Sequence, residues 1–344
     1  MAAEQKLRVA VIGVGHLGTY HARIYNDHPQ VELVAVVDPN AEKAQQLAQE
    51  LGCKALSDPS ELATLDVQAA SVAVPTAFHA EVSVPLLESG IPLLVEKPLA
   101  SNLEQADQIL EAAERGGAAL AVGHVERFQP GVKRLRELGM RPRFIECHRL
   151  SPFSFRSMDV GVVHDLMIHD LDLVLDMVDD EVVSIDAAGG AILTEREDVA
   201  SVRLVFAGGA RANVTASRAS LKPMRRFRMF SSEGYVSLDF TENYGLMVRK
   251  ADGWDEGRAK LAQLAVTDPQ QLAALAAKAG GNMDGMLDID QLELGGDERP
   301  LQAELDSFVQ SVLSGHEPEV TGQDGRKALA LAERIADAIR TEGW

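Results

Sequence analysis

The sequence predicts two domains, a doubly wound α/β sheet over residues 1–122 and an α+β domain with a largely antiparallel, open sheet over residues 123–344. A chain of 344 residues is too long for one ordinary core. Its first third alternates short aliphatic runs with helical segments, and after about residue 123 strand-like segments follow one another without helices between them. An alternative placement for the last helix is against the first domain.

The first domain contains the segments of a parallel sheet. Short apolar runs have the composition of strands that are buried on both faces. These runs are residues 7–12, 31–37, 54–56, 69–74, 93–95 and 119–122, and the helical segments between them are 17–26, 41–51, 80–89 and 103–115. Strands and helices in this alternation form a doubly wound sheet.

The second domain has a different pattern. Alternating, β-branched segments predict strands at residues 143–150, 182–192, 200–206 and 210–217, with Gly208-Gly209 as a hairpin turn between the last two. Residues 301–313 and 325–340 are amphipathic and predict the final helices. The Gly-, Ala- and Asp-rich stretch 254–294 supports no functional assignment.

Charge and composition limit the possible functions. Lys and Arg total 33 against 52 Asp and Glu, a net charge of −19, which repels nucleic acid and anionic membranes. No run approaches the roughly 20 apolar residues of a membrane span, and the polar N-terminus does not resemble a signal peptide. Cys53 and Cys147 offer neither a disulfide framework nor a metal cluster. We expect a cytoplasmic protein that acts on a small molecule.

A glycine-rich turn follows the first predicted strand and begins the first helix. In Gly13-Val14-Gly15-His16-Leu17-Gly18 the glycines permit a tight turn and let a pyrophosphate approach the helix N-terminus. Asp38 ends the second strand 20 residues later, where a carboxylate accepts hydrogen bonds from ribose hydroxyls and repels a 2′-phosphate. The context predicts a Rossmann domain that binds NAD rather than NADP. The alternative is a turn that serves packing alone.

Two further motifs carry candidate catalytic groups. Glu96-Lys97-Pro98 ends the fifth strand, at the edge where such sheets bind ligands, and a lysine there can polarise a substrate oxygen. If residues 164–172 are helical, Asp165, His169 and Asp172 share one face, and a histidine backed by a carboxylate is a usable general base. A divalent metal site and a merely solvated acidic face are the rival interpretations. We expect no metal, because hydride transfer needs none.

Taken together, these motifs resemble the Gfo/Idh/MocA oxidoreductase family over nearly the whole chain. The resemblance includes Pro75-Thr76-x-x-His79, Gly123-His124-x-x-Arg127-Phe128, Asp165-x-x-x-His169-Asp170 and the closing Glu304, Phe308 and Gly315. It implies hydride exchange between a sugar or polyol and NAD. His169 would be the base, with Lys97 as the alternative base, and Asp165 would orient His169. Lys97, before a cis proline, would bind the reacting oxygen.

The resemblance also implies which residues bind each ligand. The residues implied for NAD are Gly13, Gly15, His16, Leu17, Gly18, Asp38, Pro75, Thr76, His79, Glu96 and Lys97. Those implied for the substrate are Lys97, His124, Arg127, Asp165 and His169. The family habit also implies a homodimer or homotetramer.

The substrate is predicted from one segment. Residues 149–161 resemble the corresponding stretch of the family's UDP-N-acetylhexosamine or uronate 3-dehydrogenases, whose product ketone is passed to an aminotransferase. Arg149 and Arg156 suit a diphosphate or carboxylate, or else they form surface ion pairs. Three alternatives remain, namely an inositol or free-sugar dehydrogenase, an NAD-dependent glycosidase that oxidises transiently, and a non-catalytic NAD-binding regulator.

Overall fold

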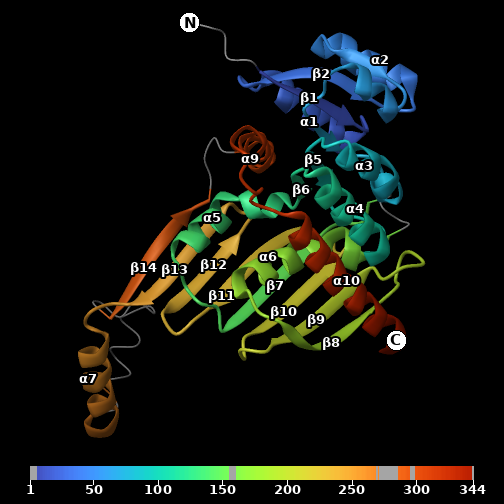
Figure 1. Ribbon diagram of the computed structural model, residues 1–344. Coiled ribbons are helices and arrows are strands. Elements are labelled where there is room, and N and C mark those ends of the chain that lie inside the picture. The colour runs from blue at the N-terminus through green and yellow to red at the C-terminus, as the bar shows by residue number, and fades with distance from the viewer. Residues whose placement is uncertain (1–5, 155–159, 269, 271–285, 295–298, 343–344) are drawn as a thin grey trace, which may run out of the picture.

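The computed structural model describes residues 6–154, 160–268, 270, 286–294 and 299–342. Two sheets lie one above the other, with the N-terminal sheet at the top of Figure 1 and the larger C-terminal sheet below it. The predicted α/β sheet followed by a largely antiparallel one is confirmed. In the described part of the chain, no helix is both long enough and apolar enough to cross a membrane.

The first sheet is parallel and has the strand order β3-β2-β1-β4-β5-β6. Its strands are β1 (Leu7–Ile12), β2 (Val31–Val37), β3 (Lys54–Leu56), β4 (Ala69–Val72), β5 (Leu93–Glu96) and β6 (Leu120–Gly123). Its helices are α1 (His16–Asp27), α2 (Ala41–Leu51), α3 (His79–Glu88) and α4 (Leu103–Gly116). The chain reverses direction across the sheet between β1 and β4, and at such a switch point the carboxyl ends of the strands leave a crevice for a ligand.

The second sheet is mixed and has the order β14-β13-β12-β11-β7-β10-β9-β8. Its strands are β7 (Phe144–Leu150), β8 (Val182–Gly190), β9 (Val199–Phe206), β10 (Arg211–Ser217), β11 (Met224–Phe230), β12 (Gly234–Asp239), β13 (Tyr244–Lys250) and β14 (Leu287–Glu293). Neighbouring strands are antiparallel except for the parallel pair β7 and β10. The sequence predicted the first part of this sheet but not β11 to β14.

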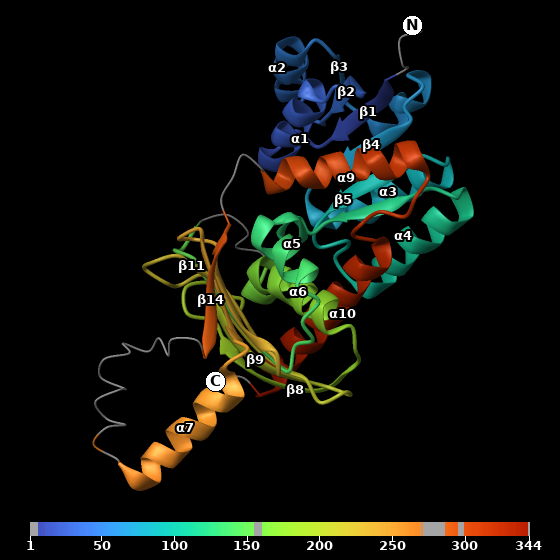
Figure 2. The same cartoon turned by 90° about the vertical axis from the view of Figure 1, so that its left-hand side faces the viewer.

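Within the described residues, helices cover only one face of this sheet. Helices α5 (Pro130–Glu137), α6 (Ile168–Val178) and α10 (Gly322–Glu342) lie between it and the first domain (Figure 2). Strand β7 shows the consequence, since Ile145 and Cys147 are buried on the covered face while Glu146 and His148 face outward. Helix α7 (Trp254–Thr267) extends away from both domains in Figures 1 and 2.

The C-terminal helices return to the first domain. Leu305, Phe308 and Val309 of α9 (Pro300–Ser314) belong to the same buried cluster as residues of β1 and β2. Helix α10 serves both domains, because Leu329 packs into the first-domain core while Ile335 packs under the second sheet. The return of α9 brings Glu304 to the end of β5, at the predicted catalytic motif.

Candidate active site

The glycine turn after β1 is built for close approach of a ligand. Gly13 has a φ of +88°, and a Cβ there would lie 2.6 Å from the Ala73 carbonyl oxygen. At Gly18 a Cβ would lie 1.7 Å from the Gly13 carbonyl oxygen, so α1 starts directly against the turn. Gly15 differs, because a Cβ there would meet nothing within 4 Å. Gly15 caps α1 without a side-chain hydrogen bond, which leaves the helix amides free to bind an anion.

Asp38 lies beside this turn, as predicted. Its Oδ2 accepts a hydrogen bond of 2.9 Å from the Val14 amide, and its Oδ1 accepts one of 2.9 Å from the Asn40 amide. The carboxylate is therefore fixed at the end of β2, where an adenosine ribose would lie. The turn, the open position at Gly15 and this acid together fit a bound NAD.

We predicted His79 as a cofactor ligand, but the structure places its ring between two loops of the first domain. The ring is 1% exposed, with Nδ1 3.0 Å from the Pro98 carbonyl oxygen and Nε2 3.0 Å from the Val74 carbonyl oxygen. This placement does not support direct contact with NAD. Instead, His79 joins the loop after β4 to the loop after β5, while Pro75 and Thr76 lie nearer the surface.

Lys97 projects from the end of β5 toward the second domain. The peptide between Lys97 and Pro98 is cis, as the family resemblance implied. Its Nζ donates a 2.8 Å hydrogen bond to the backbone carbonyl of Asp165 and lies 3.8 Å from the carboxylate Oδ1 of the same residue. Burial lowers the pKa of Lys97, while the Asp165 and Glu96 carboxylates oppose that shift.

His169 is the second residue of α6 and lies near the Lys97 ammonium group. Its Nδ1 is buried and has no hydrogen-bond partner among the described residues. Burial, together with the positive charges of Lys97 and Arg149, lowers the pKa of His169 well below its ordinary value. The imidazole is therefore neutral near pH 7, which is the form that can accept a proton.

The predicted pairing of Asp165 with His169 needs correction. Residues Val163–Met167 form a π-helical turn before α6, so the i, i+4 alignment of an α-helix does not apply there. Asp165 contacts Lys97, and the structure describes no hydrogen bond between Asp165 and His169. Asp172 is 1% exposed, and its carboxylate accepts hydrogen bonds from Arg127, so it is engaged in an ion pair.

Arg149 and Arg127 form buried ion pairs. The Arg149 guanidinium donates bonds of 2.8 and 2.9 Å to Asp170 and one of 3.2 Å to Glu126, and the residue is 6% exposed. Arg127 donates bonds of 2.7 and 2.6 Å to Asp172. Because all three nitrogens of Arg149 donate to carboxylates, its position does not support the substrate contact that we predicted.

Of the other predicted substrate ligands, two are buried and a third lies outside the described residues. His124 is completely buried, and neither of its ring nitrogens has a hydrogen-bond partner among the described residues. It therefore presents no surface to a substrate, and the same holds for Arg127, which is 4% exposed and also donates to Asp176. Arg156 lies outside the described residues.

Arg225 of β11 is a candidate that the sequence did not single out. It pairs across the sheet with Arg149 on the covered face, and its NH2 nitrogen bonds both oxygens of Glu126. The guanidinium lies 5.7 Å from the ring centroid of Phe240, its side chain is 33% exposed, and its buried Nε has no hydrogen-bond partner among the described residues. It also contributes to the lowered pKa of His169. The cluster of arginines between residues 218 and 228 was the available signal.

A dinucleotide-binding sheet whose crevice faces a lysine and a neutral histidine defines a class of protein. The chain is an NAD-dependent oxidoreductase that acts on CH–OH groups. It belongs to the Gfo/Idh/MocA family. Residues 7–124 match the model of the oxidoreductase family with an NAD-binding Rossmann fold, and residues 140–237 match the Gfo/Idh/MocA C-terminal domain.

Individual relatives cover almost the whole chain. UDP-N-acetylglucosamine 3-dehydrogenase of Acidithiobacillus ferrooxidans is 34% identical over 334 residues, 97% of each chain. A solved structure of that enzyme has a TM-score of 0.84 at 32% identity and covers 98% of both chains. Myo-inositol 2-dehydrogenase of Thermotoga maritima is 27% identical over 94% of each chain.

Proposed function

We propose that this enzyme oxidises the 3-hydroxyl of a UDP-N-acetylhexosamine to a ketone, with NAD as the acceptor. This proposal is based on the 34% identity, over 97% of both chains, to a UDP-N-acetylglucosamine 3-dehydrogenase. The identity to an inositol dehydrogenase is 27%. We further propose that the enzyme works in the cytoplasm and passes its ketone to an aminotransferase. In this proposal residues 1–122 bind NAD, and residues 123–344 bind the substrate and form the oligomer interface.

The reaction removes a proton from the hydroxyl oxygen and a hydride from its carbon. NAD, when bound, takes the hydride. In our proposal His169, which is neutral at pH 7, accepts the proton through Nε2, since Nδ1 is buried. Lys97 donates a hydrogen bond to the same oxygen and stabilises the charge that develops there before the carbonyl forms. Asp165 acts on Lys97, whose ammonium group it holds through its backbone carbonyl.

Arg225 replaces Arg149 as the proposed ligand for the anionic part of the substrate. Glu126 anchors one edge of its guanidinium, while a third of the side chain stays exposed and Nε has no hydrogen-bond partner among the described residues. Guanidinium groups of this kind bind diphosphates through paired N–H donors. We expect Arg225→Gln to raise the KM for the UDP-sugar about tenfold and to leave NAD binding unchanged, since one charge-assisted hydrogen bond is worth about 1.5 kcal/mol or more.

A matched control exists on α7. Arg258 of this helix is exposed, and α7 extends away from both domains (Figures 1 and 2). Arg258→Gln removes the same charge and should leave both Michaelis constants unchanged. If the two variants have the same KM for the UDP-sugar, Arg225 does not bind it.

The substrate assignment has a direct test. Purified enzyme and NAD are incubated with UDP-N-acetylglucosamine, free N-acetylglucosamine or inositol in parallel, and NADH absorbance is followed with hydroxylamine present to trap the ketone. NADH should form only with the UDP-sugar. Formation with inositol instead would establish the alternative dehydrogenase, and sugar release without NADH would establish a glycosidase.

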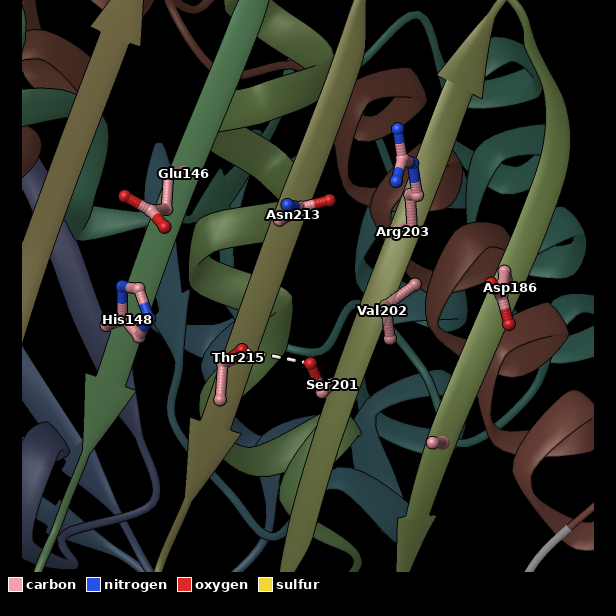
Figure 3. Close-up of a pocket in the computed structure, with 9 residues that line it drawn as sticks. Glu146, His148, Asp186, Ser201, Val202, Arg203, Asn213 and Thr215 are labelled. Atoms are coloured by element: carbon pink, nitrogen blue, oxygen red, sulfur yellow. Dashed lines mark hydrogen bonds between the residues drawn. The ribbon is translucent and has the colours of Figure 1, made fainter.

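The uncovered face of the second sheet supports the proposed homodimer or homotetramer. Glu146, His148, Asp186 and Arg203 line a hollow there, and Ser201 and Thr215 are joined by a 3.1 Å hydrogen bond (Figure 3). Both charge signs are present, so the face is compatible with a second copy of itself. Light scattering should report a multiple of the chain mass, and a monomer at micromolar concentration would refute this proposal.

A further inference from the structure

A buried carboxyl group lies behind the catalytic turn, and the reaction proposed above does not use it. Glu304 of α9 is 2% exposed, and neither of its carboxyl oxygens has a hydrogen-bond partner among the described residues. Its nearest ionisable neighbours are His21 of α1 and Glu96 of β5, and the candidate ligand atoms of all three lie within 4.8 Å of one another. A buried polar group without a partner is costly, so this group needs an explanation.

The charges around Glu304 are mostly negative. Three carboxylates repel a negative charge on Glu304. They belong to Glu96 on β5, Glu126 in the turn after β6, and Asp172 on α6. On α1, buried Tyr25 also interacts with Glu304 electrostatically, and burial raises the pKa of Tyr25. His21 is the basic group of the cluster, and it lies 3.1 Å from the Oε1 atom of Glu96.

The proton of the Glu96–Glu304 pair is located on Glu304. Burial and the neighbouring carboxylates raise the pKa of Glu304 well above its usual range. The contacts from His21 and Lys97 outweigh burial at Glu96 and hold the pKa of that carboxyl below its usual range. Near pH 7 the pair thus consists of a neutral acid at Glu304 and a carboxylate at Glu96, which is the arrangement that a hydrogen bond between two carboxyl groups requires.

The position of Glu96 bears directly on Lys97. Its Oε2 accepts a hydrogen bond of 3.2 Å from the Lys97 amide. On the other side, a Cβ at Gly123 would lie 3.0 Å from that same oxygen, so the carboxylate fills the space that the missing side chain leaves. A hydrogen-bond donor on α9 would hold this carboxylate from a third side.

We propose that Glu304 is a positioning residue, whose protonated carboxyl group donates a hydrogen bond to the Glu96 carboxylate and thereby fixes the Glu96–Lys97 turn at the active site from α9. The group touches neither substrate nor cofactor. It acts through Glu96, and the buried triad His21–Glu96–Glu304 connects α9 to the catalytic lysine.

The first test is spectroscopic and needs no substrate. Infrared spectra of the intact enzyme at neutral pH should show the carbonyl stretch of a buried protonated carboxyl group, and Glu304→Gln should remove it. The control is Glu317→Gln, which removes an exposed carboxylate from the loop after α9 and should leave the band in place. The absence of the band in the wild type, or its survival in Glu304→Gln, would overturn the proposal.

The second test separates positioning from packing. Glu304→Gln keeps a neutral hydrogen-bond donor, so its kcat should stay within about twofold of the wild type, whereas Glu304→Leu fills the space without a donor and should lower kcat about tenfold. The KM for NAD should change less than kcat in both variants. Equal kcat values in the two variants would show that Glu304 only fills space.

Stability against pH gives a third readout. Because the pKa of Glu304 is raised in the folded protein, the folded state loses stability as the pH rises from the ordinary glutamate range through that raised pKa. Glu304→Gln should remove this loss and be more stable than the wild type at alkaline pH. The triad also has ligand types that bind zinc, so a stoichiometric metal in the purified enzyme that Glu304→Gln loses would refute the shared proton.

Discussion

Replacing Arg149 by methionine tests whether this arginine stabilises the fold or binds the substrate. The change removes three hydrogen bonds to Asp170 and Glu126 and leaves two carboxylates that are each less than a tenth exposed. Breaking a buried ion pair from one side costs about 3–5 kcal/mol, mainly because the partner charge stays buried. Glu126 retains Arg225, which places the expected loss at the lower end of that range.

The corresponding fall in melting temperature is large. An unfolding entropy of about 2.1 cal/mol/K per residue means that a cooperative unit of about 200 residues loses roughly 2–3 °C for each kcal/mol. For a loss of about 3 kcal/mol we therefore expect Arg149→Met to lower the Tm by about 6–9 °C in a calorimetric scan. Arg258→Met, at an exposed position of α7, should lower it by no more than about 1 °C.

Kinetics complete this test. Below its melting temperature Arg149→Met should keep the wild-type KM for the UDP-sugar, because all three guanidinium nitrogens already donate to carboxylates. An unchanged Tm combined with a KM raised tenfold would refute the reasoning and restore Arg149 as a substrate ligand.

Three further predictions concern the catalytic and cofactor residues. His169→Asn and Lys97→Met should each lower kcat at least about a hundredfold with NAD binding intact, measured by fluorescence titration, and full activity in both would refute their roles. Burial lowers the pKa of His169 well below 6.5, so the His169 base stays neutral as the pH falls below 6.5. Burial also lowers the pKa of Lys97 below 10.5. The profile of kcat/KM should then be flat around pH 7, and an acid limb centred above 6.5 would contradict this. Asp38→Ser should improve the use of NADP relative to NAD at least about tenfold, and an unchanged cofactor ratio would show that Asp38 does not discriminate.

The first domain could be predicted almost to the residue because its signals are local. Apart from Arg8 and Glu32, strands β1 and β2 are aliphatic runs that are buried on both faces. Helix α2 has a capping Asn40 before it and Gly52 after it. Strand β11 was missed for the opposite reason. Its sequence, Met224–Phe230, is rich in arginines whose charges are neutralised only in the folded sheet, for example by Glu146 on β7.

The catalytic groups could be predicted by type but their partners could not. Lys97 and His169 follow from motifs, whereas the partners of Arg149 lie 21 and 23 residues away along the chain. The π-helical turn before α6 had no local signal in the sequence, and it determines that Asp165 faces Lys97. Glu304 reaches its place only because α9 folds back on the first domain.

The return of α9 has a consequence for synthesis of the protein on the ribosome. Leu305, Phe308 and Val309 complete a cluster that otherwise consists of residues from the first 121 positions. At about 5–20 residues per second, roughly 10–40 s separate synthesis of the N-terminal sheet from synthesis of the helix that covers it. We expect the nascent first domain to stay sensitive to protease during that interval, as cleavage of ribosome-bound chains arrested before residue 300 would reveal. The N-terminal domain is then made first but reaches its finished state last, together with the C-terminal end of the chain.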